Sequence, residues 1–116
     1  MKNWKDFLIN KNSKISDAIN MLDKCQCIFV VDKNKELFGT VTDRDIRNAL
    51  LNHINKDAPI TEIMNKKPSV LVEPLDYKKI REKLKNSYYE HYPIIDNNNK
   101  IIGVQNNEEI LNIRYD

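Results

Sequence analysis

Two stretches of the chain repeat one pattern: FVVDKNKELFG at residues 29–39 and PIIDNNNKIIG at residues 93–103. Position by position, each has an apolar pair, an aspartate, a polar run, a second apolar pair and a glycine. The closing residues, Gly39 and Gly103, are the two glycines of the whole chain. Glycine at a strand usually marks a bulge or a close approach of another backbone or a ligand. The repeat therefore predicts two related structural units, each with an unobstructed backbone at its glycine.

The apolar spacing on either side extends the repeat into a full set of elements. Steps of three and four residues predict helices, and two apolar runs joined by a polar turn predict an antiparallel hairpin. The first copy is expected to contain a lead-in strand at 7–9, a helix over 15–22 capped by Ser13, a hairpin over 28–41, and a helix from Thr42 that buries Ile46, Ala49 and Leu50. The second copy repeats this order with a lead-in at 69–72, a helix through Tyr77, Ile80 and Leu84, a hairpin over 92–104, and a helix from Asn106. Between the copies, residues 57–64 predict a short helical turn entered through Pro59. The fold class is α/β, of the α+β kind.

Size and composition limit the classes of protein. A chain of 116 residues is one domain's worth, and a copy of about 50 residues would be marginal alone. The 19 basic and 17 acidic residues are interspersed, which gives no reason to expect nucleic acid or a membrane as a partner. Apolar runs are shorter than a bilayer span, and Cys25 and Cys27 lack the spacing of a zinc site. We expect a cytoplasmic protein with no metal and two reduced, buried cysteines.

The most specific local motif is GTVTDRD at residues 39–45, where a strand ends on a helix start. A structural explanation is available, because Thr42 and Asp45 have the spacing of a capping box. The same geometry also suits an anion, since a helix start offers free N–H groups and the positive end of a dipole. In that case Thr42 donates to a phosphate, Arg44 supplies charge, and Asp45 accepts from sugar hydroxyls. Capping and binding are compatible.

At these residues the sequence resembles the CBS domain pair, or Bateman module. The resemblance rests on the twofold helix–strand–strand–helix pattern, the GTVTDRD motif and the IMNKKP segment at residues 63–68. It implies tandem CBS repeats whose two small sheets pack about a pseudo-twofold axis. The implied organisation is a single module over 1–116, with repeat one at about 7–53, a linker at about 54–67 and repeat two at about 68–116.

The resemblance also implies a regulatory ligand, an adenine nucleotide such as AMP, ADP or ATP, bound between the repeats with no cofactor required. Carried over residue by residue, Thr42 contacts phosphate after Gly39, Arg44 adds charge, and Asp45 holds the ribose. The residues that border the base are then Cys27, Ile28 and Val30, with Ile15 as a second wall. The second site is expected to be weaker, because Asn106 and Glu109 replace the hydroxyl and the aspartate; its other members are Tyr92 and Ile94.

Residues 1–9 resemble the CBS segment that precedes a sugar-1-phosphate nucleotidyltransferase domain in some bacterial surface-sugar pathways. This resemblance implies a regulatory fragment that is not itself an enzyme, linked to a catalytic domain and dimeric through its CBS helices. Two alternatives stay open. The chain is a dimerisation or scaffold module whose site no longer binds, or it senses another ligand such as a nucleotide sugar or S-adenosylmethionine.

Overall fold

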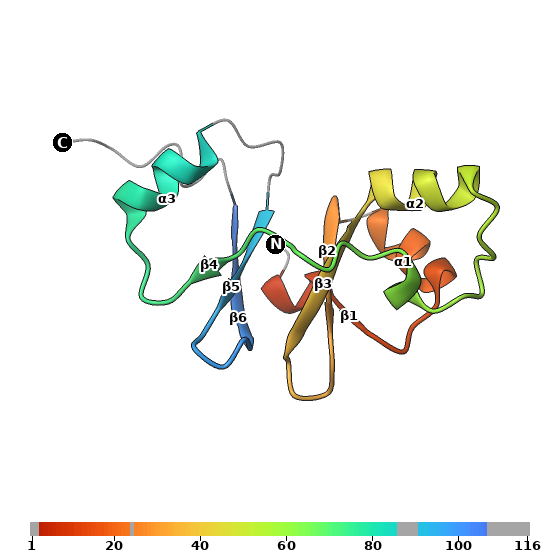
Figure 1. The fold of residues 1–116 in the computed structure, drawn as a ribbon. Coiled ribbons are helices and arrows are strands. Elements are labelled where there is room, and N and C mark those ends of the chain that lie inside the picture. Colours follow the sequence, from red (N-terminus) through yellow and green to blue (C-terminus); the bar gives the residue numbers. More distant parts are fainter. Residues whose placement is uncertain (1–2, 24, 86–90, 107–116) are drawn as a thin grey trace. The chain divides into compact units, whose positions relative to one another are not determined.

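Each copy of the repeated pattern forms the hairpin of its own three-stranded sheet. The computed structural model describes residues 3–23, 25–85 and 91–106 (Figure 1). The chain divides into two units, Met1–Pro68 and Ser69–Asp116, which we call the first and the second unit. In both, the outer lead-in strand pairs parallel to the central strand, and the central strand pairs antiparallel to the third. The predicted mixture of helices with two small sheets is confirmed.

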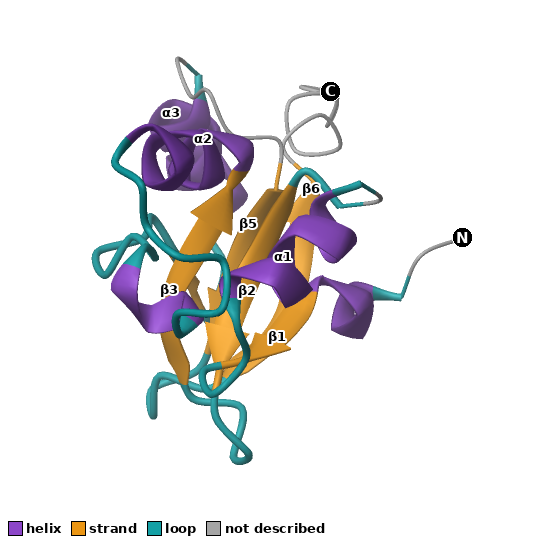
Figure 2. Ribbon diagram, turned by 90° about the vertical axis from the view of Figure 1, so that its right-hand side faces the viewer, coloured by secondary structure: helices purple, strands orange, loops and turns teal. Residues whose placement is uncertain are grey.

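The first unit contains the larger number of described elements. Strand β2 is central in the order β1-β2-β3, and α1 lies across the face of this sheet (Figure 2). The elements are η1 (Trp4–Phe7), β1 (Leu8–Asn10), α1 (Ile15–Leu22), β2 (Cys27–Val31), β3 (Leu37–Thr42), α2 (Asp43–Leu51) and η2 (Ile60–Glu62). The last is the short helical turn expected after Pro59, which is its N-cap residue.

The second unit repeats the order lead-in strand, helix, hairpin. Its elements are β4 (Leu71–Val72), α3 (Tyr77–Leu84), β5 (His91–Ile95) and β6 (Ile101–Asn106), with β5 central in its sheet. Asn106, expected to begin a helix, is the last residue of β6. The rest of that expected helix, from residue 107 on, lies outside the described residues.

The two hairpin turns have the same hydrogen bonds. The Asp32 carboxylate accepts from the main-chain N–H groups of residues 34 and 36, at 2.8 and 3.0 Å. The Asp96 carboxylate accepts from residues 98 and 100 at the same two distances. One residue of each turn is left-handed, Lys35 with φ 67° and Asn99 with φ 62°. An aspartate that accepts from the chain two residues on is a turn former, which explains why it recurs in both copies.

Both strand ladders are interrupted beside the glycine. Gly39 pairs with Val30 and Gly103 with Ile94, and in each hairpin the register shifts at the next step. One extra residue of the returning strand is accommodated there, as in a β-bulge. The predicted link between these glycines and a bulge is thus confirmed in both units.

The segment between the repeats is held to the first unit by its main chain. The N–H groups of Ile15 and Ser16 donate to the carbonyls of Ala58 and Lys56, at 3.0 and 2.9 Å. The prediction that Ser13 caps α1 is wrong. Lys14 is the N-cap residue, and its N–H donates to the Asp17 carboxylate at 2.9 Å. Linker carbonyls therefore satisfy donors that a serine hydroxyl was expected to satisfy.

Strand β2 is buried along its whole length, whereas some apolar residues of the two helices are exposed. All five residues of β2 are buried, and so are Ile46 and Ala49 of α2. The prediction that Leu50 is buried is wrong, because 55% of its surface is exposed. Ile19, on α1, is 38% exposed. The spacing of apolar residues indicates which face of a helix points inward, but it does not show how many residues of that face are buried.

Candidate functional site

The strand-to-helix junction of the first unit is built around one carboxylate. Thr42 is the N-cap of α2 and Asp45 is its third residue, as the capping-box spacing predicted. The Oδ2 atom of Asp45 accepts from the Thr42 main-chain N–H at 2.9 Å and from the Thr42 hydroxyl at 3.2 Å. Both residues are half-buried. The other oxygen, Oδ1, has no hydrogen-bond partner among the described residues.

The two helix starts of the first unit differ in what their N–H groups meet. At α1, the linker carbonyls of Lys56 and Ala58 accept from the first turn. At α2, the N–H groups of Asp43 and Arg44 have no acceptor within the part of the chain that the structure describes. Free N–H groups at a helix N-terminus favour an anion. Of the two described α-helices of this unit, α2 therefore presents the open helix start.

Cys27 lies beside this junction. It pairs with Thr42 across the hairpin, and the Asp45 charge reaches its thiol. The pKa of Cys27 is raised from 9.0 to about 12, chiefly by burial and also by the nearby Asp45 and Cys25. The thiol is therefore neutral at physiological pH, so it is an apolar neighbour of Asp45 and not a nucleophile. Both cysteines are free and buried, as predicted.

The remaining predicted residues of this site do not all share one face. Successive side chains of a strand alternate, and directly paired residues lie on the same side. Cys27 and Thr42 therefore share one face of the hairpin, whereas Ile28 and the pair Val30–Gly39 lie on the other. Ile28 and Val30 are completely buried.

Strand β2 extends beyond β1 at the junction. Strand β1 pairs with β2 only from Phe29 to Val31, so Cys27 and Ile28 lie beyond that ladder. At the junction, Cys27 and Ile28 could contact a ligand through their main chain at the edge that β1 does not cover, and Cys27 could also contact it through its thiol. Of the other predicted residues, Ile15 is 1% exposed at the start of α1, and Arg44 is exposed on α2.

The close approach at Gly39 is made by the protein itself. A Cβ atom at this position would lie 2.6 Å from the carbonyl oxygen of Asn65 and 2.9 Å from the sulfur of Met64. Asn65 also exchanges two main-chain hydrogen bonds with Thr40, at 3.1 and 2.8 Å. The linker therefore covers the outer edge of β3, and glycine is required there for packing. No signal within the 39–45 motif could have indicated this contact.

The second unit places its predicted residues in a different setting. His91 and Asn106 occupy the paired positions that Cys27 and Thr42 occupy in the first unit, with 3.4 Å between Nε2 of the histidine and Nδ2 of the asparagine. Tyr92 is 3% exposed and belongs to a core cluster with Leu71 and Ile80, against which Ile94 packs. Glu109 lies outside the described residues.

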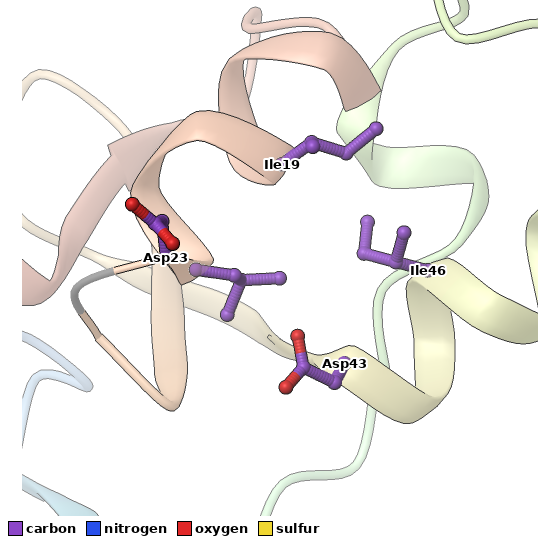
Figure 3. A pocket seen from close by; sticks show the side chains of 5 residues that line it. Ile19, Asp23, Asp43 and Ile46 are labelled. Carbon is purple, nitrogen blue, oxygen red and sulfur yellow. The ribbon is translucent and has the colours of Figure 1, made fainter.

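A cavity of about 350 Å³ opens between α1 and α2. In the close-up, the Ile19 and Ile46 side chains point toward each other, and the Asp23 and Asp43 carboxylates lie on the other side (Figure 3). Leu22 completes the lining. None of these five residues was predicted as a site residue. The signal present in the sequence was an apolar stripe on each helix, which the spacing assigned entirely to the core.

Two kinds of feature are absent from the described residues. These residues contain no group of three or more histidine, cysteine, aspartate or glutamate side chains placed to hold a metal ion. No described helix combines the length and the apolar character that crossing a bilayer requires.

Curated relatives match most of this chain but only part of their own length. An uncharacterised 17.7 kDa protein of Acidianus ambivalens is 26% identical over 86% of this chain, which spans 62% of that protein. A homoserine O-acetyltransferase of Methanosphaera stadtmanae is 28% identical over 90% of the chain, which spans 21% of it. An inosine-5'-monophosphate dehydrogenase of Nitrosopumilus maritimus is 27% identical over 91% of the chain, which spans 22% of it.

Solved structures share the fold at low sequence identity. The CBS domains of a transcriptional regulator from Streptococcus pneumoniae superpose with a TM-score of 0.79 at 14% identity, over 97% of this chain and 92% of that one. CBSX2 in complex with AMP gives 0.73 at 21% identity, over 96% and 94%. The cytosolic domain of the magnesium channel MgtE in complex with ATP gives 0.76 at 18% identity, over 92% and 44%.

The family model for the CBS domain matches residues 4–52 and 60–105. Each match contains one of the two repeated stretches, and together they cover most of the chain. They confirm the family resemblance. With two tandem matches that together take up most of its length, this chain belongs to the CBS domain family.

Proposed function

We propose that the chain is a regulatory module that binds an adenine nucleotide at the start of α2. The observation that carries this proposal is the open helix start, where the N–H groups of Asp43 and Arg44 lie next to the Thr42–Asp45 pair. Structures of the same fold hold AMP in CBSX2 and ATP in MgtE, which supports the ligand class. No metal or cofactor is part of the proposal.

Binding would exchange hydrogen bonds at Asp45. Without ligand, the Thr42 hydroxyl donates to Asp45 Oδ2. With ligand, that hydroxyl turns to a phosphate oxygen, and the ribose hydroxyls donate to the carboxylate in its place. The exposed guanidinium of Arg44 adds positive charge. Because each donor lost by Asp45 is replaced by a sugar hydroxyl, little hydrogen bonding is lost when the capping contact opens.

The base would lie along the main chain of Cys27 and Ile28, where β2 extends beyond β1. Val30 and Ile15 are buried, so they would support this wall from behind. The second unit lacks the hydroxyl and carboxylate pair, since Asn106 stands where Thr42 stands. We therefore propose one competent site per chain, with a second that is weak or vacant.

The bound nucleotide would act on a linked enzyme by favouring one arrangement of the module over another. Residues 1–9 make a sugar-1-phosphate nucleotidyltransferase the first candidate for that enzyme. The relatives that match this chain include an acetyltransferase and a dehydrogenase, so the linkage to an enzyme is better supported than its class. We further propose that the chain is cytoplasmic and pairs through its CBS helices.

A thermal-shift titration tests the proposal. AMP, ADP, ATP, GTP and S-adenosylmethionine are each added to the 116-residue chain. A ligand at about 100 times its Kd stabilises the folded state by about 2.7 kcal/mol, which raises the Tm of a domain of this size by several degrees. At least one adenine nucleotide is expected to give this shift. Asp45→Asn should abolish it, whereas Asp57→Asn, the same change at an exposed linker carboxylate, should leave it intact.

Two results would contradict the proposal. A full shift in Asp45→Asn would show that this carboxylate does not hold the sugar. The absence of a shift with all five ligands would favour the scaffold alternative, in which the Thr42–Asp45 pair is only a helix cap. Isothermal titration with the best ligand then counts the sites, and two equal sites per chain would contradict the predicted difference between the repeats.

A further inference from the structure

The thioether of Met64 lies against β3 at Gly39, the residue of that strand that has no side chain. A Cβ atom on Gly39 would stand 2.9 Å from the Met64 sulfur and 3.0 Å from its Cγ, so the space between sulfur and strand is too small for another heavy atom. Next to this contact, Thr40 and Asn65 exchange two main-chain hydrogen bonds, at 3.1 and 2.8 Å. The thioether and these two hydrogen bonds together hold the end of the linker to β3.

The linker has a second attachment, which does not involve Met64. The N–H of Ile15 donates to the Ala58 carbonyl at 3.0 Å, and the N–H of Ile60 donates to the Ser13 carbonyl at 2.8 Å. These hydrogen bonds hold the earlier part of the linker beside the start of α1. Because the two attachments use different residues and different partners, one of them can be lost while the other stays.

Methionine sulfur is open to oxidation where an oxidant can reach it, and Met64 is half-buried and not enclosed. A hydroperoxide transfers one oxygen atom to a thioether. The sulfur lone pair attacks the peroxide, the O–O bond breaks as the S–O bond forms, and the released hydroxide takes up a proton and leaves as water when the oxidant is hydrogen peroxide. The sulfur is oxidised by two electrons and the peroxide is reduced by two. Methionine sulfoxide reductases reverse this change.

The sulfoxide does not suit the position that the thioether occupies. A thioether is a weak hydrogen-bond acceptor, whereas a sulfoxide is polar, so burying its oxygen without a donor costs free energy. The N–H of Thr40, beside this contact, already donates to the Asn65 carbonyl. The space toward Gly39 cannot take the added oxygen. The oxidised side chain must therefore turn toward water, and its neighbour Asn65 moves with it.

We propose that Met64 is a site of reversible oxidative modification, at which a hydroperoxide forms the sulfoxide and releases the end of the linker from β3. The attachment beside α1 stays in place. The stretch between the attached part of the linker and β4 then grows from residues 66–70 to residues 61–70. The inference goes beyond the proposed nucleotide site and does not depend on it.

Amide hydrogen exchange measured by NMR on the 116-residue chain tests the release. The chain is treated with hydrogen peroxide, and peptide mass spectrometry identifies which methionines carry an added oxygen. Once Met64 is the sulfoxide, the amides of Thr40 and Asn65 should exchange about tenfold faster or more, because the hydrogen bonds that protect them open. The amides of Ile15 and Ile60 should keep their rates. Methionine sulfoxide reductase with a thiol reductant should restore the slow exchange.

Three variants separate Met64 from other oxidised groups. Met64→Leu keeps the side-chain volume but cannot be oxidised there, so peroxide should leave Thr40 and Asn65 protected. Met21→Leu removes the other described methionine, which is also half-buried, and peroxide should still accelerate both amides. Any oxidation of the two cysteines occurs equally in these variants. In Gly39→Ala the contact is already displaced, so exchange should be fast from the start and peroxide should add little.

Three results would overturn the inference. Slow exchange at Thr40 and Asn65 after Met64 has been converted would show that the thioether does not hold the linker. An unmodified Met64 under conditions that oxidise Met21 would show that its sulfur is not reachable. Equal acceleration at Ile15 would mean general loosening in place of a local release. The measurements contain no nucleotide, so they are independent of the thermal-shift result, and the unmodified chain decides the question even if a variant folds poorly.

Discussion

The first and second units share a hairpin design but differ in what surrounds it. In both, an aspartate organises the turn and a glycine stands beside a bulge. In the first unit the linker packs over the glycine and fills the outer edge of the sheet, whereas a Cβ at Gly103 would meet only the Ile94 side chain, at 3.6 Å, among the described residues. The same sequence pattern thus indicates the same backbone shape in both units. Among the described residues, the long-range contact that requires glycine is found in the first unit.

The largest expected difference between the two units is the effect of replacing their glycines on the unfolding free energy. Gly39→Ala would push a methyl group into the Asn65 carbonyl, so the linker or β3 must move, and we expect a loss of about 2–3 kcal/mol of unfolding free energy. Gly103→Ala has ordinary contacts and should be neutral or stabilise by about 0.5 kcal/mol, since glycine is unfavourable inside a strand. Urea unfolding followed by the fluorescence of Trp4 measures both. Equal losses would show that the linker contact is not what requires glycine in the first unit.

A second test uses pH, because only the first unit has a thiol at the junction. The folded-state pKa of Cys27 is raised to about 12 from 9.0, so the unfolded chain ionises first. This stabilising contribution is complete below about pH 9 and is lost as the pH rises toward 12. Between pH 9 and 10 it should cost about 1 kcal/mol of unfolding free energy.

The control for this pH effect is Cys27→Ser, which cannot ionise in this range. Its unfolding free energy should be lower throughout but should fall less steeply between pH 9 and 10 than that of the unmodified chain. Parallel curves for the two proteins would show that Cys27 ionises equally in the folded and unfolded chains.

The smallest expected effect is at the left-handed turn residues. Lys35 and Asn99 have φ of 67° and 62°, and asparagine tolerates this conformation better than lysine does. Lys35→Asn should therefore stabilise by about 0.5 kcal/mol, and Asn99→Lys should destabilise by about the same amount. Chemical unfolding of both variants and of the double exchange is the measurement. Stabilisation by both single changes would mean that side-chain contacts outweigh backbone preference here.

The repeated hairpin and its turn were predictable because their determinants are local. Asp32 and Asp96 bond to residues two and four positions on, so a short window of sequence contains the whole interaction. Thr42 as N-cap of α2 was predictable for the same reason. The cap of α1 was not, because its donors are satisfied by Lys56 and Ala58, some 40 residues away.

The limits of the site prediction have the same physical origin. Thr42 and Cys27 lie together because they pair across one hairpin, and Asp45 reaches Thr42 from the first turn of α2. Gly39 was expected to allow a close approach of another backbone or a ligand, and the sequence could not show that the approaching residues are 64 and 65. Leu50 was assigned to the core because a periodic pattern does not show how far along a helix the sheet extends. Pairing within a hairpin is thus readable from sequence, and packing between distant segments is not.

The attachment of the linker to the first unit leaves few residues at which the backbone between the two units can bend. Main-chain hydrogen bonds hold residues 56–65 to α1 and β3, and the chain next joins a sheet at Leu71. Any change in the relation between the two units must therefore come from backbone torsions in the few residues between. Substitutions at residues 66–70, none of which belongs to the proposed nucleotide site, are therefore expected to change how far a ligand's effect is transmitted, and by linkage to change the apparent affinity by the same coupling.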